Sequence, residues 1–170
     1  MLIDTGLLVL RVILGVLFIG HGAQKLFGWF GGPGLKGTTG WLGSMGLRPA
    51  RFWALLGAFA EFGGGLLFLL GFLNPLGALG ISAVMLTVII TVHWHKGFWN
   101  SNGGIEFPLV NLAIALGIAL IGPGTYSLDT VLGFALPHPL SAIVGYAVVV
   151  LGVAVLLLST KRQPTPNKPA

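Results

Sequence analysis

The sequence predicts an all-α membrane protein, with a four-helix transmembrane bundle followed by a fifth, C-terminal transmembrane helix. Three observations support this fold class. The chain of 170 residues is 55% hydrophobic and only 8% charged, whereas soluble domains carry about 25% charged residues. Five apolar stretches approach the ~20 residues that a helix needs to cross the hydrocarbon core. The basic residues also collect on one side of the topology that these stretches define.

The five expected spans cover residues 6–27, 52–73, 76–93, 106–121 and 140–158. The fourth is the shortest, but it is too apolar for a soluble loop. Asn74-Pro75 predicts a tight turn, so the second and third spans should form an antiparallel hairpin. Gly122-Pro123-Gly124 should end the fourth span, because these residues do not continue a helix.

We therefore expect three parts in the chain. The four-helix bundle occupies residues 1–130, the additional helix lies in 131–160, and 161–170 form a disordered basic tail.

Five alternating spans place most of the basic residues on one side of the membrane. That side receives Lys36, Arg48, Arg51, Lys96, Lys161, Arg162 and Lys168, with Lys25 at its edge. The opposite side receives neither lysine nor arginine. The positive-inside rule therefore puts the basic side and the C-terminus in the cytoplasm and the N-terminus outside, as in a multi-pass protein of the bacterial inner membrane.

Several function classes are excluded by composition and motif context. The net charge of +5 is spread along the chain rather than gathered into one stripe, which argues against a nucleic-acid partner. The chain has no cysteine, so it supplies no disulfide, thiol nucleophile or iron–sulfur ligand. The G-x-G-x-x-G pattern at 32–37 follows a membrane helix instead of a β-strand, so it does not predict a nucleotide site.

The first span carries four polar residues, Arg11, His21, Gln24 and Lys25, on a helix that is otherwise compatible with lipid. Polar groups inside a bilayer are costly and usually face a protein interior, which makes them candidates for a site. His21 and Lys25 lie one turn apart on one helix face, with Gln24 beside them. Arg11 lies about 15 Å from His21 along the axis, so we expect it to snorkel outward, away from the pocket. Asp4 or Asp129 would then be its partner.

Glu61 is the strongest single candidate, because it falls near the middle of the second span. An isolated carboxylate there must pair with a cation or stay protonated. Two interpretations remain open: a structural pair with Arg11 or His21, and a group that exchanges protons or binds a ligand. The three glycines at 63–65 would let a neighbouring helix approach closely beside it.

The third span ends in VHWHKGFWN, which supplies His93, Trp94, His95 and Phe98. Histidines at i and i+2 point to opposite sides of a helix, so they do not predict a metal pair. The aromatic residues fit either an interfacial belt or a flat ligand site. With Glu106 at the start of the fourth span, these groups share one membrane depth with His21, Gln24 and Lys25. We therefore expect a polar pocket between helices near the cytoplasmic leaflet, with Glu61 beneath it.

Three ordered motifs resemble the DoxX family of small bacterial membrane proteins. They are R-x-x-L-G-x-x-F-x-x-H-G-x-x-K-L at 11–26, AEFGGGLLFLLG at 60–71 and EFPLVNLAIALGIALIGPGTYSLD at 106–129. The resemblance implies a four-helix membrane bundle in a redox context, since relatives include a membrane subunit of thiosulfate:quinone oxidoreductase. The chain departs from that pattern by continuing after YSLD into a fifth apolar stretch.

Three functions remain in competition. The first is a redox-complex subunit that binds a quinone between the spans, with His21 or His93 donating to the quinone carbonyl and Glu61 exchanging the proton. Trp94 and Phe98 would line the ring, and electrons would come from other subunits, so no metal or covalent cofactor is expected in this chain. The second is a non-catalytic adaptor that holds partner proteins or a second copy of itself. The third, a small-solute transporter, ranks last because no pair of broken spans supports it.

The topology can be tested directly. A reporter fused after Ala170 should be active in the cytoplasm, because five spans are needed to place the basic tail with the other basic residues. A periplasmic signal from the same fusion would contradict the five-span arrangement.

Overall fold

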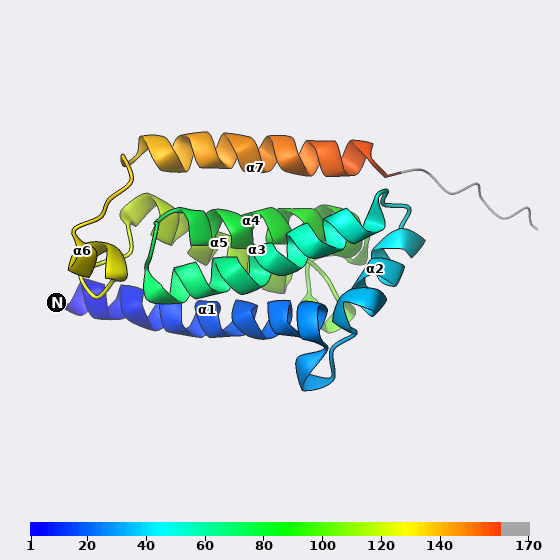
Figure 1. Cartoon of the computed structure of the whole chain (residues 1–170), viewed down its shortest axis with the longest axis horizontal. Helices are drawn as coiled ribbons and strands as arrows, with labels where there is room; N and C mark the ends of the chain where they lie inside the picture. Colours follow the sequence, from blue (N-terminus) through cyan, green and yellow to red (C-terminus); the bar gives the residue numbers. More distant parts are fainter. Residues whose placement is uncertain (161–170) are drawn as a thin grey trace, which may run out of the picture.

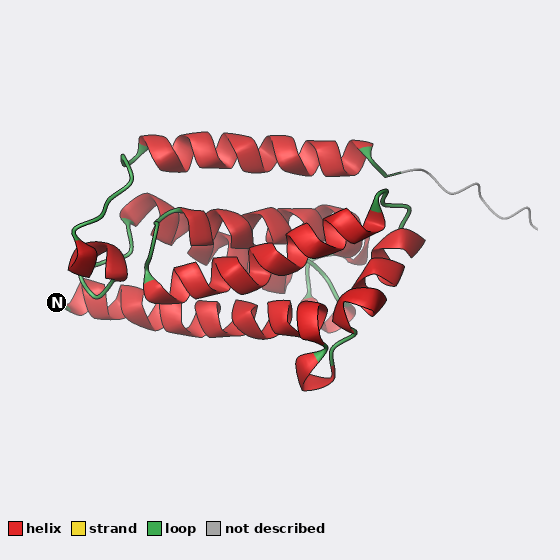
Figure 2. Cartoon of the chain, in the orientation of Figure 1, coloured by secondary structure: helices red, strands yellow, loops and turns green. Residues whose placement is uncertain are grey.

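The computed structural model describes residues 1–160 and forms an elongated helical assembly in that part of the chain (Figures 1 and 2). Its α-helices are α1 (Leu2–Phe27), α2 (Gly34–Ser44), α3 (Ala50–Leu70), α4 (Leu76–Val88), α5 (Glu106–Ile121), α6 (Leu128–Leu132) and α7 (Leu140–Leu158). Single turns of other helix types lie at Trp29–Gly31, Ile89–His93, Trp94–Lys96 and Asn100–Asn102. The tail at 161–170, predicted to be disordered, lies outside the described residues.

The predicted all-α membrane fold is confirmed. Four helices are long and apolar enough to span a membrane: Leu2–Phe27, Ala50–Leu70, Leu76–Lys96 and Leu140–Leu158. Glu106–Ile121 is a shorter apolar helix, as its sequence predicts. The third span reaches Lys96 because a π-helical turn at Ile89–His93 continues α4. The helix α2, which covers the end of the bundle opposite the N-terminus, is an element that the span prediction did not include (Figure 1).

Helix α1 packs most extensively against α3, and glycines set their separation. A Cβ atom at Gly15 would lie 2.7 Å from Leu69 Cβ, and one at Gly65 would lie 2.8 Å from the Ile19 nitrogen. Neither position has room for a side chain, so the two backbones approach as small residues allow in membrane helices. This close packing fixes the antiparallel register of α1 and α3.

The main core lies between α1, α3, α4 and α5. Its buried members include Leu14, Phe18, Phe68, Ile81 and Ala115. Helix α7 lies along the outside of this bundle and packs against α4 (Figure 1). Most of α7 is therefore left to contact lipid, as expected of a highly apolar span.

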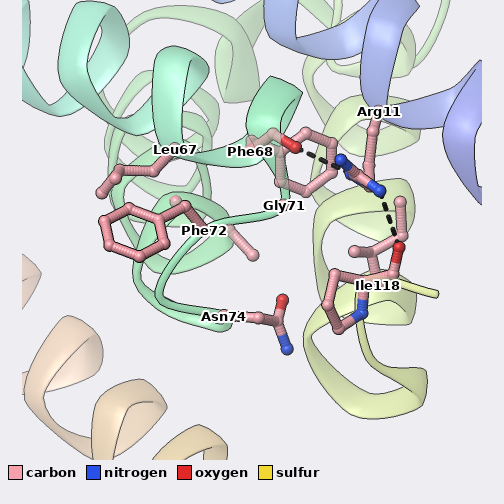
Figure 3. Close-up of a pocket in the computed structure, with 10 residues that line it drawn as sticks. Arg11, Leu67, Phe68, Gly71, Phe72, Asn74 and Ile118 are labelled. Carbon is pink, nitrogen blue, oxygen red and sulfur yellow. Dashed lines mark hydrogen bonds between the residues drawn. The ribbon is translucent and has the colours of Figure 1, made fainter. Parts of the chain in front are cut away.

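Arg11 connects α1 to the end of α3 and to the loop after α5. It lies away from the predicted pocket, as expected, but it is only 1% exposed, so the expectation that it snorkels outward was wrong. Its guanidinium donates to the carbonyl oxygens of Phe68 (3.1 Å) and Leu69 (2.8 Å) near the end of α3. It also donates to the carbonyls of Pro123 and Tyr126, each at 2.8 Å, in the loop that follows α5. Figure 3 shows the Arg11 guanidinium beside Phe68 and Gly71, with the hydrogen bond to the Phe68 carbonyl dashed. Arg11 thus supplies donors to carbonyls in the last turn of α3, of which that of Phe68 also accepts from the Gly71 nitrogen at 3.2 Å.

The same end contains a second polar contact between distant segments. Asp129 accepts from the backbone nitrogens of Leu73 (2.8 Å) and Asn74 (2.9 Å), in the turn between α3 and α4. The Asp129 nitrogen in turn donates to the Gly71 carbonyl at 3.1 Å. Gly71 has φ +62 and lies so close to the Arg11 guanidinium that a Cβ would clash with it. Arg11 and Asp129 together tie α1, the α3–α4 turn and the segment after α5 into one unit.

Replacing Arg11 with lysine should destabilise the fold even though the charge is kept. An ammonium group cannot reproduce the planar fork, so at least one of the four carbonyls would lose its donor, at a cost of about 1–3 kcal/mol. The melting temperature of Arg11→Lys in detergent should fall clearly, whereas Arg51→Lys at an exposed position should leave it unchanged. An unaltered melting temperature for Arg11→Lys would show that the guanidinium network is not needed for stability.

Candidate functional site: a buried ion pair beside an apolar cavity

The Glu61 carboxylate is buried and forms an ion pair with Lys25. Lys25 Nζ lies 2.6 Å from Glu61 Oε1, and the side chains are 27% and 4% exposed, respectively. Lys25 comes from the last turn of α1, and Glu61 comes from the middle of α3. The expected partner, Arg11 or His21, was therefore wrong. Arg11 is engaged at the other end of α1, and the α1–α3 register brings Lys25 to Glu61 instead.

One oxygen of this carboxylate has no hydrogen-bond partner among the residues that the structure describes. Glu61 Oε2 is buried and accepts no hydrogen bond from the described residues, and Asn111 Nδ2 on α5 is in the same condition. Leaving a buried polar atom unpaired costs about 1–3 kcal/mol, and more for a charged group. Such an atom in a native fold calls for an explanation, and a group that binds a ligand or a proton is one of the recognised ones.

A large apolar cavity reaches Lys25 of this ion pair, whereas Glu61 is not among its described lining residues. It has a volume of about 530 Å³ and is bounded by Lys25 together with α2, α3, α4 and α7. We refer to it as the apolar cavity. Lys25 is the one charged residue among its described lining residues. The lining threonines do not change this apolar character, because the hydroxyls of Thr38, Thr87 and Thr91 all donate to carbonyls of their own helices.

Two of the predicted site residues stabilise a loop instead of facing the ion pair. His93 Nδ1 lies 2.6 Å from the Gly103 carbonyl oxygen. Glu106 Oε2 accepts from the Asn100 nitrogen at 2.8 Å. Both contacts hold the segment that connects the third span to α5.

The remaining predicted residues are dispersed. Trp94 and Phe98 are 64% and 49% exposed, as in an interfacial belt. His95 lies at a separate cavity of about 330 Å³, lined also by Met45, Leu47 and Thr160. Gln24 Nε2 donates to the Phe30 carbonyl at 3.5 Å, and the half-buried His21 ring lies 6.2 Å from that of Phe18. Of the predicted residues, the structure joins Lys25 and Glu61 by a polar contact, and their roles in binding stay predictions.

Sequence reasoning missed the apolar cavity and the α7 residues on its wall. The available signal was the pair Gly145 and Gly152. These residues are seven positions apart, so they lie on the same face of α7 and leave that face without large side chains. That face alone does not indicate whether a neighbouring helix or a void lies opposite.

The fold and the inward-facing polar groups define a multi-pass helical membrane protein. The family model DoxX matches residues 6–94, which is more than half of the chain, and the chain belongs to this family. It is also similar to the Escherichia coli (strain K12) protein named "Inner membrane protein YqjF", with 34% identity over 132 residues. This match covers 76% of the chain and 93% of that relative. No solved structure matches the chain significantly.

The ion pair should respond asymmetrically to mutation. Lys25→Met leaves a nearly inaccessible carboxylate without its cation, which typically costs about 3–5 kcal/mol. Glu61→Gln leaves Lys25 without its anion, but Lys25 already reaches solvent, so the loss of stability should be smaller. The melting temperature should therefore fall more for Lys25→Met than for Glu61→Gln, and the double variant should recover part of the loss.

The exposed Lys36, replaced by methionine, provides the matched control and should leave the melting temperature unchanged. Additive effects of the two ion-pair substitutions would mean that the charges do not interact in the folded protein.

Proposed function

We propose that this protein is an inner-membrane subunit of a redox complex, and that it binds a quinone with its polar head at Lys25 and Glu61. One observation carries this proposal. Within residues 1–160, the one charged residue on the wall of an apolar cavity is paired with a buried carboxylate, and one oxygen of that carboxylate accepts no hydrogen bond there. Ligand sites commonly combine an apolar pocket with a few polar groups.

The chemistry of quinone reduction suits these two residues. Reduction of a quinone to a quinol takes up two electrons and two protons. Lys25 Nζ would donate a hydrogen bond to one carbonyl oxygen and stabilise the negative charge that develops there. In the ion pair the proton is carried by Lys25, so Lys25 would pass it to this oxygen as the quinone is reduced. Glu61, as the neighbouring base, would then take up a proton from the side of the bundle where Lys25 reaches solvent and return it to Lys25. The second proton would go to the other carbonyl oxygen. His21, one turn from Lys25, is the second candidate for a proton carrier.

The electrons would come from another subunit of the complex. The chain has no cysteine for a dithiol relay or an iron–sulfur cluster. Within the proposal, the basic end with Lys25 faces the cytoplasm and the N-terminus faces the periplasm, as the distribution of lysine and arginine favours. Electron delivery would then occur from the cytoplasmic side.

A non-catalytic adaptor is the second candidate. The Lys25–Glu61 pair joins α1 to α3 by itself, so it would also be accounted for as a device that orders the bundle. A variant that keeps the shape of Glu61 but does not titrate separates the two functions.

Glu61→Gln should preserve the fold but lower quinone-dependent turnover of the intact complex by about 10²-fold or more, because general acid–base catalysis contributes on that scale. The amide keeps the size and hydrogen-bonding capacity of the side chain while removing its proton exchange. Turnover and melting temperature should be measured on the same preparation.

Glu106→Gln is the matched control, since this carboxylate lies outside the apolar cavity and should leave turnover unchanged. A folded, fully active Glu61→Gln complex would contradict the catalytic proposal and favour the adaptor.

A further inference from the structure

Helix α7 closes one side of the apolar cavity. Its residues Gly145, Val148, Val149, Gly152, Val153 and Leu156 all belong to the wall. It contacts α4, where the Ser82 and Tyr146 hydroxyls lie 3.0 Å apart and Gly145 lies against Leu79. Helix α7 also lies outside the residues 6–94 that match the family model. Without α7, the facing surfaces of α3 and α4 would be an open groove against lipid.

The cavity is much longer than a quinone ring. Its lining residues on α4 and the π-helical turn that continues it extend from Leu76 to Thr91, which is about 22 Å at 1.5 Å per residue. This distance is roughly two-thirds of the ~30 Å hydrocarbon core of a bilayer. Lys25 reaches the wall toward the end covered by α2, and Leu76 and Gly145 mark the opposite end. The charged group of Lys25 therefore lies toward one end of a long apolar cavity.

Two glycines keep this space open. A Cβ at Gly57 on α3 or at Gly152 on α7 would meet no atom within 4 Å, and both residues line the cavity. In contrast, Gly15 and Gly65 lie where a Cβ would collide with the neighbouring helix. Gly57 and Gly152 thus leave volume unfilled, whereas the other two bring helices together. Because the wall of this space is almost wholly apolar, its lining residues lack dispersion contacts unless an apolar group fills the space.

We propose that the apolar cavity binds the long isoprenoid chain of the quinone, with α7 holding that chain beside the bundle. The inference rests on the proposed function and narrows its ligand to long-chain quinones. The head lies at Lys25 and Glu61, and the chain runs between α3, α4 and α7 toward Leu76. Affinity then depends on chain length, because most of the buried ligand surface belongs to the chain.

Native mass spectrometry of the full-length protein tests this inference, because the bound mass identifies the ligand. Two benzoquinones with the same head are used as probes, one without a side chain and one with a long isoprenoid chain. The long-chain probe should bind at least about tenfold more tightly to the unmodified protein, since each buried CH₂ adds affinity.

Filling the cavity should remove this preference. Gly57→Leu and Gly152→Leu each place a side chain in the open space and improve helix propensity, so the fold should persist. Each should weaken binding of the long-chain probe by at least about tenfold and leave the short probe within about twofold. The matched controls are Gly63→Leu on α3, another glycine with nothing within 4 Å, and the exposed Ala147→Leu on α7. Neither control residue lines the cavity, so both should bind like the unmodified protein.

The outcomes separate the inference from the proposed function. Equal affinity for both probes in the unmodified protein would overturn the chain site while leaving quinone binding intact, and this comparison needs no variant.

Failure of both probes to bind would refute the quinone function. A long isoprenoid alcohol without a quinone head is then the third probe. If Gly57→Leu and Gly152→Leu blocked its binding, the cavity would remain a chain site, but for a different amphiphile. If the alcohol also failed to bind, the chain site would be overturned as well.

Discussion

A bilayer offers no hydrogen-bond partners, so every polar group inside this protein must be satisfied by the protein itself. This constraint acts most strongly on the contact between α1 and α3. Arg11 donates to the carbonyls at the end of α3, and Lys25 pairs with Glu61, about 10 Å from Phe68 along the α3 axis at 1.5 Å per residue. Between these two polar contacts, Gly15 and Gly65 bring the backbones together. The register of α1 and α3 is thereby fixed at two positions, and it determines which side chain meets Glu61.

The same register gives Lys25 two environments. Its ammonium group contacts Glu61, and its side chain also lines the apolar cavity. A bound head group would therefore contact the Lys25 ammonium, which is already paired with the buried Glu61 carboxylate. Binding or reduction of a ligand at Lys25 would change the electrostatic environment of Glu61 directly. In the proposed function, this coupling between a ligand and a titratable group links electron transfer to proton uptake, whereas α7 determines how much apolar surface the ligand can bury.

The sequence predicted the apolar spans well, including the short fourth one, because hydrophobic length is a local property. It also identified Glu61 as a carboxylate inside the membrane, since an acidic residue within an apolar helix is conspicuous without any structure. It did not identify Lys25 as the partner, because a helical face indicates direction but does not fix the register between two helices. The role of Arg11 was missed for a related reason: its acceptors are backbone carbonyls, which every sequence contains. Of the glycines at 63–65, Gly64 and Gly65 do contact neighbouring helices, whereas Gly63 faces open space. The apolar cavity could not be predicted, because it depends on where α7 packs.

Solid-state NMR of the protein in liposomes tests the central claim most directly. The chain contains two glutamates, Glu61 and Glu106, so their side-chain carboxyl carbons can be assigned with one substitution. With ¹⁵N-labelled lysine and ¹³C-labelled glutamate, the Glu61 carboxyl carbon should show a strong dipolar coupling to a lysine Nζ. Addition of a long-chain quinone should then shift the Glu61 carboxyl resonance and leave that of Glu106 unchanged. Absence of the coupling would contradict the ion pair, and a Glu61 resonance that does not respond to the quinone would contradict the proposal that Glu61 belongs to a quinone site.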